Sequence, residues 1–420
     1  MISQINQFKI EDIKTQFNPF RMNFTCAETA VLDNIRKHRA LTKSELVELT
    51  DFSRSKIAGC VNTLLEKEML TKDGLGDNTG GRRSILYTFN GNKGLLLGAD
   101  IGATSIDLII TDLNRKVLAR YAEAALVSDG PIKILDRIND LFNELLIKYG
   151  LSNRAILAYG IGVPGPVNFR EGMVISPPIM PGWDQFPIID YLQGSWPETN
   201  IIIDNDVNIM ALGEYNKQKN KDRKNMIFIK IGSGIGAGII LDGEIYRGSS
   251  GCAGDIGHIC VDKNGPICPC GNRGCLEVMA GGIAIAELAM TAAKEGQSTI
   301  LKKYLDKNGG ILTAFDVGVA SREGDKTSIE IIRESGRIIG EVLAVMVNIY
   351  NPGMIVIGGG VSKLGNLLLS SIRQAVLKRS LPLATKDLPI VFSPIIEDAG
   401  VIGAMNLALD QLIKCQMTEL

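Results

Sequence analysis

Apolar and polar positions follow two different patterns along this chain, and the pattern changes near residue 90. Between residues 24 and 90, apolar side chains recur at helical spacing in three short stretches. From Leu95 onward, short apolar runs that end in glycine alternate with amphipathic stretches, as strands and helices do in an α/β protein. The sequence therefore predicts a small N-terminal domain of residues 1–90 and an α/β domain of residues 91–420.

The N-terminal domain is predicted to hold three helices and a two-stranded wing. Thr42 and Glu45 form a capping box at the start of the second helix, and Ser53 caps the third. The expected core positions are Val31, Leu32 and Ile35 in the first helix, Leu46 and Leu49 in the second, and Ile57, Val61, Leu64 and Leu65 in the third. Two helices joined by a tight turn, followed by a glycine-rich wing at residues 74–81, predict a winged helix-turn-helix.

The expected DNA contacts lie in the first turn of the third helix and on the wing. They are Ser53, Arg54, Ser55, Lys56, Arg82 and Arg83. The first turn of such a helix reaches base edges in the major groove, and paired arginines suit phosphates or a minor groove. Basic residues exceed acidic ones only slightly here, which predicts that two copies bind one double-stranded operator. The alternative is a three-helix dimerisation module without DNA.

Bulk properties restrict the possible partners. The 420 residues carry a formal net charge of −1, so any nucleic-acid surface is local. Residues 342–362 form an uncharged run of membrane-spanning length, but Asn351, Pro352 and Gly353 interrupt it. A buried helix, a turn and a buried strand are therefore favoured over a membrane span. With no signal-peptide pattern, we expect a cytoplasmic protein without a membrane partner.

Three glycine turns follow apolar strands in the larger domain. They lie at residues 100–105, 232–234 and 358–360. Each turn could bind phosphate through free N–H groups or simply reverse the chain. Three such turns in this order are typical of actin-like kinases. The candidate nucleotide-binding residues are Asp100, Gly102, Thr104, Ser233, Gly234 and Gly359.

A polar loop follows the apolar run of residues 201–203. Asp206 in this loop could accept a proton from a substrate hydroxyl, as the general base does in phosphoryl transfer. Asp and Asn also favour the first position of a helix, and the two roles are compatible.

Clustered metal-ligating residues give the sharpest local signal. His258 is followed by Cys268, Cys270 and Cys275, and three thiolates with one imidazole suit tetrahedral Zn²⁺. A closed set of four protein ligands indicates a structural ion. Cys260 is a rival ligand, and four unmetallated cysteines are the alternative.

Together these motifs resemble the ROK family (repressors, open reading frames and kinases) over about residues 24–420. The resemblance rests on Gly257-His258 followed by Cys268-x-Cys270-Gly271-x-x-Gly274-Cys275-x-Glu277. It implies an actin-like (ribonuclease H-like) two-lobe sugar-kinase fold behind the winged helix. Lobe one would span about 91–205 plus the C-terminal helix, and lobe two about 206–395. The sugar-binding residues it implies are Gly165, Asn205, Asp206, Asp255, His258 and Glu277.

The chain departs from the kinase pattern at several positions. Kinase members carry Asp-Ile-Gly-Gly-Thr-Lys at the first turn, where this chain has Ala103 and Ser105. Asp255 replaces the usual Glu, and Pro178 stands where sugar kinases place an Asn. These changes argue against ATP and Mg²⁺ as cofactors. The branch resembled is that of the xylose and N-acetylglucosamine repressors.

Three functions remain open on the sequence. The first is a repressor of carbohydrate uptake or catabolism, a homodimer or homotetramer that responds to a small sugar or sugar phosphate. The second is an ATP-dependent hexose or N-acetylhexosamine kinase with Asp206 as catalytic base. The third is a zinc-stabilised scaffold without a ligand.

Overall fold

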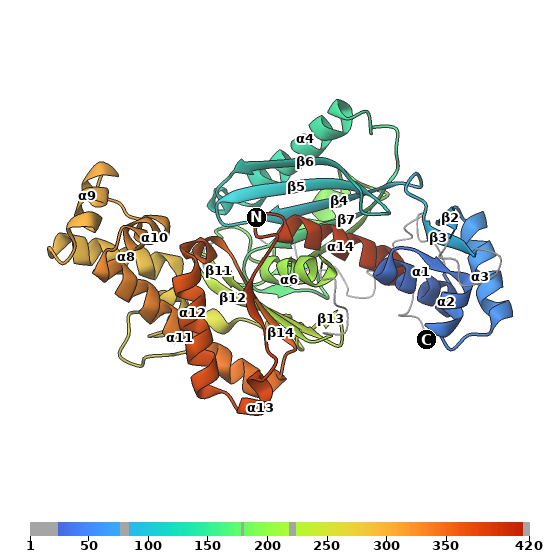
Figure 1. Ribbon diagram of the computed structural model, residues 1–420. Helices are drawn as coiled ribbons and strands as arrows, with labels where there is room; N and C mark the ends of the chain where they lie inside the picture. Colours follow the sequence, from blue (N-terminus) through green and yellow to red (C-terminus); the bar gives the residue numbers. More distant parts are fainter. Residues whose placement is uncertain (1–23, 76–83, 178–179, 218–223, 415–420) are drawn as a thin grey trace, which may run out of the picture.

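The computed structural model describes residues 24–75, 84–177, 180–217 and 224–414 (Figure 1). The N-terminal unit, blue in Figure 1, lies at one end of the molecule beside the C-terminal helix α14 (Ala399–Lys414). Two five-stranded sheets and their helices form the rest. No helix in the described residues is long and apolar enough to cross a membrane.

The N-terminal unit has the predicted helices and wing strands. It comprises α1 (Cys26–His38), β1 (Leu41–Thr42), α2 (Lys43–Glu48), α3 (Arg54–Glu66), β2 (Leu70–Leu75) and β3 (Ile85–Phe89), with strand order β1-β3-β2. The capping box of Thr42 and Glu45 is present at α2, and Ser53 caps α3 by accepting a hydrogen bond from the Lys56 N–H. Both caps confirm the sequence analysis, because each satisfies N–H groups that the first helical turn leaves free.

One predicted core position of this unit was wrong, and another lies at the edge of the core. Leu49 is 45% exposed, because it follows the last residue of the short helix α2 and lies beyond the buried stripe. Leu65 is partly buried and packs against the core, which also includes Cys60. At 100° per residue, Leu65 lies at the edge of the stripe made by Ile57, Val61 and Leu64.

The first large sheet has strand order β10-β7-β4-β5-β6. Its strands are β4 (Leu95–Ile101), β5 (Ser105–Asp112), β6 (Val117–Ala124), β7 (Ile156–Val163) and β10 (Asn200–Asn205). β4, β5 and β6 are antiparallel neighbours, whereas β7 and β10 run parallel to β4. The smaller elements of this lobe are η2 (Val127–Asp129), α4 (Pro131–Lys148), β8 (Val167–Asn168), β9 (Met173–Val174) and α5 (Ile188–Gln193). The apolar side of α4 shares a core with the sheet.

The second large sheet repeats this topology, with order β13-β12-β11-β14-β15. Its strands are β11 (Met226–Ile231), β12 (Ile235–Leu241), β13 (Glu244–Ile245), β14 (Met354–Gly358) and β15 (Ile390–Phe392). The helices of this lobe are η3 (Ile256–His258), α7 (Leu276–Ala280), α8 (Gly282–Lys294), α9 (Thr299–Lys307), α10 (Ala314–Arg322), α11 (Lys326–Tyr350), η4 (Gly360–Leu364), α12 (Asn366–Arg379) and α13 (Pro382–Thr385). As predicted, residues 342–362 form a helix end, a turn with Asn351 in the left-handed region, and a buried strand.

Helices α6 (Asp206–Lys217) and α14 pack against each other between the two sheets. α6 follows the last strand of the first sheet and contacts β11 and β12 of the second. α14 follows the last strand of the second sheet and contacts β4 and β7 of the first. The helices touch backbone to backbone: a Cβ at Gly213 would lie 2.1 Å from the Ala399 carbonyl oxygen, and one at Gly403 1.6 Å from that of Ile209. Only glycine permits this approach.

Candidate functional site

The predicted metal ligands come together in the loops around η3 and α7. The donor atoms of His258, Cys268, Cys270 and Cys275 all lie within 4.8 Å of one another. The Cys268 Sγ lies 3.5 Å from Nδ1 of His258, and the Cys270 Sγ lies 3.7 Å from that of Cys275. Two thiolates bound at about 2.3 Å to a tetrahedral zinc lie about 3.8 Å apart, so the four donors have suitable spacing for such an ion.

The backbone around these ligands is fixed by turns that only small residues permit. Gly274 has a φ of 62°, and a Cβ there would lie 1.5 Å from the carbonyl oxygen of Asp262. Cys260 forms a β-bridge with Cys275 but is not one of the four clustered donors. The pKa of Cys270 is lowered to about 7, chiefly because its sulfur accepts a hydrogen bond from the Asn272 backbone N–H.

Two of the predicted sugar-binding residues touch directly. The Asn205 side-chain amide donates to the Gly165 carbonyl oxygen at 2.8 Å, across the ends of β7 and β10. The Asn205 Oδ1 accepts from the Val207 N–H at 2.9 Å and thereby caps α6. The capping role that Asp and Asn favour at this position is therefore filled by Asn205.

Asp206, at the start of α6, is paired with a lysine on β11. Its Oδ2 lies 2.5 Å from Nζ of Lys230 on β11, and its Oδ1 accepts from the Val207 N–H at 2.9 Å. Asp100, at the end of β4, lies close enough to interact electrostatically with both. Burial raises the pKa of Asp100 to about 7, although the Lys230 charge opposes this shift. Burial also lowers the pKa of Lys230, but Asp206 and Asp100 outweigh it, and the pKa is raised overall.

Lys230 was not singled out on the sequence. The available signal was a single charge in the apolar strand 226–231, where all residues except Lys230 are buried. Its two cross-strand partners are Gly236 and Gly358. The interaction with Asp206 joins α6 to β11 and could not be read from spacing alone.

The second half of the predicted sugar site surrounds the turn between β11 and β12. Oε2 of Glu277 accepts a hydrogen bond from the Ile235 N–H at 3.2 Å. A Cβ at Gly234 would lie 2.3 Å from that oxygen, so the carboxylate rests against the turn. Asp255 is partly exposed, with Oδ1 4.0 Å from Nε2 of His258, the ring nitrogen that faces away from Cys268.

The predicted nucleotide-binding turns carry internal hydrogen bonds. The Gly102 N–H donates to the Ser105 carbonyl oxygen and the Gly232 N–H to that of Gly234, both at 2.8 Å. These two N–H groups are thus used within their own turns. The structure brings the second and third turns together: a Cβ at Gly359 would lie 2.4 Å from the carbonyl oxygen of Ile231. Thr104 accepts from the Ala125 N–H through its carbonyl oxygen, and Ser233 lies at the tip of the second turn.

The four predicted DNA contacts on α3 share one exposed surface. Ser53, Arg54, Ser55 and Lys56 are all exposed at the start of the helix. Arg82 and Arg83 lie outside the described residues, as does Pro178. The free N-terminal turn of α3 is thus available to a partner, with its basic side chains pointing away from the core.

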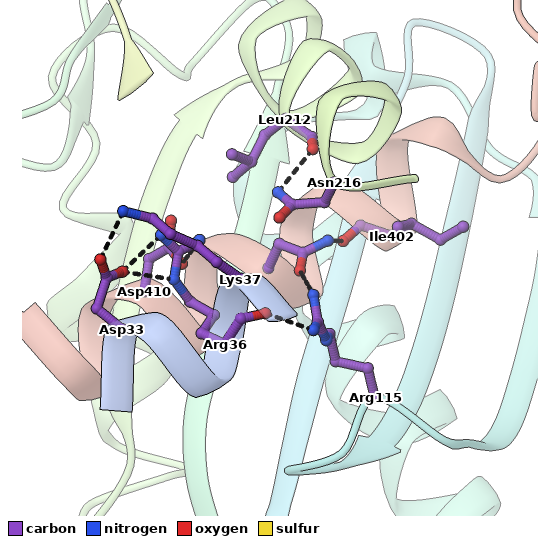
Figure 2. A network of polar contacts seen from close by, with 9 residues as sticks. Asp33, Arg36, Lys37, Arg115, Leu212, Asn216, Ile402 and Asp410 are labelled. Atoms are coloured by element: carbon purple, nitrogen blue, oxygen red, sulfur yellow. Dashed lines mark hydrogen bonds and ion pairs between the residues drawn. The ribbon is translucent and has the colours of Figure 1, made fainter. Parts of the chain in front are cut away.

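A buried polar network docks the N-terminal unit onto the larger one (Figure 2). Nη1 of Arg36 on α1 lies 2.9 Å from Oδ1 of Asp410 on α14, and Nη2 lies 2.7 Å from Oδ1 of Asp33. Nη2 of Arg115, from the turn between β5 and β6, donates to the Arg36 carbonyl oxygen at 2.6 Å. Around this network, apolar side chains of α1 share a core with α14, including Ile35.

An ion pair ties the two lobes beside Asn205. Nη2 of Arg247 lies 2.8 Å from Oδ2 of buried Asp204, and its guanidinium stacks 3.8 Å from the ring centre of Phe169. Arg247 follows β13 in one lobe, whereas Asp204 and Phe169 belong to the other. Sequence reasoning missed this pair because its members are far apart along the chain.

Comparison with known proteins gives a consistent set of relatives. A family model described as "ROK family" matches residues 96–411. A xylose repressor of Caldicellulosiruptor bescii is 28% identical over 385 residues, which are 91% of this chain and 95% of that protein. A glucokinase of Halalkalibacterium halodurans is 34% identical, over 75% of this chain and 95% of the kinase.

Solved structures give the same picture of the fold. A ROK family transcriptional regulator, described as a homologue of the Escherichia coli MLC protein, has a TM-score of 0.79 at 24% identity, over 94% of this chain and 97% of that one. A glucokinase from Streptomyces griseus, solved with glucose and AMPPNP, has a TM-score of 0.63 at 28% identity, over 75% of this chain and 99% of that one. The predicted α/β actin-like two-lobe fold behind a winged helix-turn-helix is confirmed.

Proposed function

This chain belongs to the ROK family, and from that premise we propose that it is a sugar-responsive transcription regulator, a repressor of carbohydrate uptake or catabolism genes. One observation carries the proposal: the repressor relative matches 91% of the chain, whereas the glucokinase matches 75% of it with nearly its whole length. The part that a kinase does not need is a winged helix with an exposed basic first turn on α3.

The winged helix would bind double-stranded operator DNA as part of a homodimer or homotetramer. Ser53, Arg54, Ser55 and Lys56 would face base edges and phosphates, and Arg82 and Arg83 would extend the contact from the wing. A single α3 offers only two basic side chains in its first turn, so two copies on one operator would supply the needed charge.

The sugar would lie between the lobes. Gly165, Asn205 and Asp206 would bind it from one side, and Asp255, His258 and Glu277 from the other. Carboxylates and an amide that converge from two lobes suit several hydroxyl groups, because each can bind a hydroxyl without a charge on the ligand. A sugar that binds more tightly to the closed arrangement shifts the lobes toward it.

Zinc would hold the loop that carries the second half of the sugar site. His258, Cys268, Cys270 and Cys275 would be its ligands, and four protein ligands leave no open position for catalysis. When bound, the ion supplies stability and fixes the ring of His258. Nδ1 of this ring would face the metal, so Nε2 would be directed toward Asp255 and the sugar.

Docking through α14 would carry the response to the DNA. Because α1 pairs with α14 through Arg36 and Asp410, a change in lobe arrangement that moves α14 also moves the winged helix. Two distinct sites linked by one shared element are the requirement for allosteric coupling.

The test selects an operator from a random DNA pool with the full chain and measures its affinity with xylose, glucose and N-acetylglucosamine. We expect operator binding that one sugar weakens at least fivefold. Lys56→Ala should lower DNA affinity and leave the sugar-induced thermal shift unchanged, whereas Asn205→Ala should do the reverse. Absence of any sequence-specific DNA binding would refute the proposal.

A sugar kinase is the second candidate, favoured by the 34% identity to a glucokinase and by Asp206 at the base position. A coupled assay of ATP turnover across hexoses and N-acetylhexosamines tests it. Turnover that Asp206→Asn abolishes would favour the kinase.

A further inference from the structure

The kinase-like cleft contains a cation supplied by the chain itself. Nζ of Lys230 contacts Oδ2 of Asp206 at 2.5 Å, and Asp100 lies within electrostatic range of both groups. Asp206 is 5% exposed and one oxygen of Asp100 is fully buried, whereas the Lys230 side chain is 27% exposed, so the carboxylates are more shielded from water than the ammonium. Lys230 comes from lobe two, whereas Asp100 belongs to lobe one.

Phosphoryl transfer by this fold would need the same space for other purposes. A divalent cation prefers several oxygen ligands, and carboxylates supply them in phosphoryl-transfer enzymes. The base must also be free to accept the proton of the attacking hydroxyl. In this chain one oxygen of Asp206 contacts Lys230 and the other accepts from the Val207 N–H. An ammonium that contacts Asp206 and lies within electrostatic range of Asp100 repels a metal ion, so these residues do not fit Mg²⁺ with ATP.

The local packing supports a fixed position for this side chain. Gly236 and Gly358 flank Lys230 on the neighbouring strands, and Val207 and Phe228 pack closely against these two glycines. Its Cε would lie 3.9 Å from a Cβ at Gly232, so the side chain runs along the second glycine turn. Oδ1 of Asp100 has no hydrogen-bond partner in the described structure, and the nearby ammonium is the charge that offsets it.

We propose that Lys230 is the resident cation of the cleft, which takes the place of a divalent metal between Asp100 and Asp206. The protein therefore binds its sugar without a divalent metal in the cleft and does not phosphorylate it. Asp206 accepts a hydrogen bond from a sugar hydroxyl, and the proton stays on the sugar. This inference rests on the proposed function for the identity of the ligand, but its central measurement needs neither sugar nor DNA.

The test uses Mn²⁺ as the probe, followed by electron paramagnetic resonance on the zinc-loaded full chain. Wild type should show no cleft site with a dissociation constant below about 1 mM. Lys230→Met, which keeps the length and removes the charge, should gain one site that binds at least tenfold more tightly. Adding Asp206→Asn should remove that site again. Lys302→Met, at an exposed pair with Asp306, is the matched control and should behave as wild type.

Three results decide the matter. A wild-type Mn²⁺ site that Asp206→Asn abolishes would overturn the proposal without any lysine variant. A folded Lys230→Met protein that gains no site would overturn it as well, and Lys230→Gln serves as the second variant if Lys230→Met fails to fold. Should operator binding be absent while the Mn²⁺ results hold, the proposed regulator fails and the role of Lys230 stands.

Discussion

Removal of the Asp410 carboxylate should loosen the winged helix selectively. The guanidinium of Arg36 is 6% exposed and lies between Asp410 and Asp33. Burial lowers the pKa of Arg115 to about 10, helped by the charges of Arg39 and Arg36, and the carboxylate of Asp410 opposes this shift. In Asp410→Ala, Arg36 keeps its contact with Asp33 (Figure 2) and a longer-range attraction to Glu244.

The magnitude follows from the burial of the pair. Loss of one partner from a buried ion pair destabilises by about 3–5 kcal/mol. Because Asp33 still pairs with Arg36, we take the lower end, about 3 kcal/mol. Undocking of α1 from α14 exposes the unpaired charges to water. The free energy needed for local opening of the N-terminal unit is therefore lowered by this amount. A change of about 3 kcal/mol corresponds to roughly a hundredfold in the opening equilibrium.

Hydrogen exchange followed by mass spectrometry measures this opening in the full chain. Amides of α1 should exchange roughly a hundredfold faster in Asp410→Ala than in wild type, whereas those of α4 and α11 should not change. Asp306→Ala removes a carboxylate from an exposed pair and is the control. Unchanged exchange in α1, or equal acceleration throughout the chain, would show that the pair does not dock the winged helix.

Three further predictions address the metal, the cleft and the DNA contact. Cys275→Ala should release one zinc equivalent in a chromogenic chelator assay and lower the melting temperature by roughly 5 °C or more. Cys26→Ser, at an exposed cysteine, is the control and should do neither. Zinc retained by Cys275→Ala would contradict the assignment. Since the pKa of Asp100 is raised on folding from 3.8 to about 7, its ionisation destabilises the folded state, so the contribution of Asp100 to wild-type stability should fall as pH rises from about 4 to 7. Asp100→Asn should lose this slope in denaturant titrations and gain up to about 4 kcal/mol at pH 8, and an unchanged slope would refute the assignment. Ser53→Ala should cost about 1 kcal/mol of stability through loss of the α3 cap. Lys56→Ala should weaken operator binding and reduce its salt dependence by about one counterion. Equal salt slopes for Lys56→Ala and wild type would exclude a phosphate contact.

Features encoded within a few residues were predicted well. The capping box at Thr42, the end of α11 near Asn351 and the clustering of the metal ligands each depend on neighbours along the chain. Local chemistry is sufficient there because one turn or one helix end decides the outcome. The exposure of Leu49 was missed for a related reason: periodicity gives a face but not the residue at which a short helix ends.

Contacts between distant segments could not be predicted in this way. Lys230 with Asp206, Arg247 with Asp204, and Arg36 with Asp410 each join separate elements. Their pairing depends on how sheets and helices pack, which hydrophobic spacing does not specify. The sequence offered only a charge within an apolar strand at Lys230, and nothing comparable marked Asp410.

The glycine contact between α6 and α14 has a mechanical consequence. Gly213 and Gly403 bring the two backbones together, and the apolar side chains of both helices pack beside that contact, namely Ile209, Leu212, Ala404 and Leu407. α6 contacts the second sheet and α14 the first, so any movement of one lobe against the other must change this close contact. The winged helix is attached to α14, which is the lobe-one side of this contact. It therefore moves together with lobe one, and a ligand that shifts lobe two changes the position of the winged helix relative to lobe two.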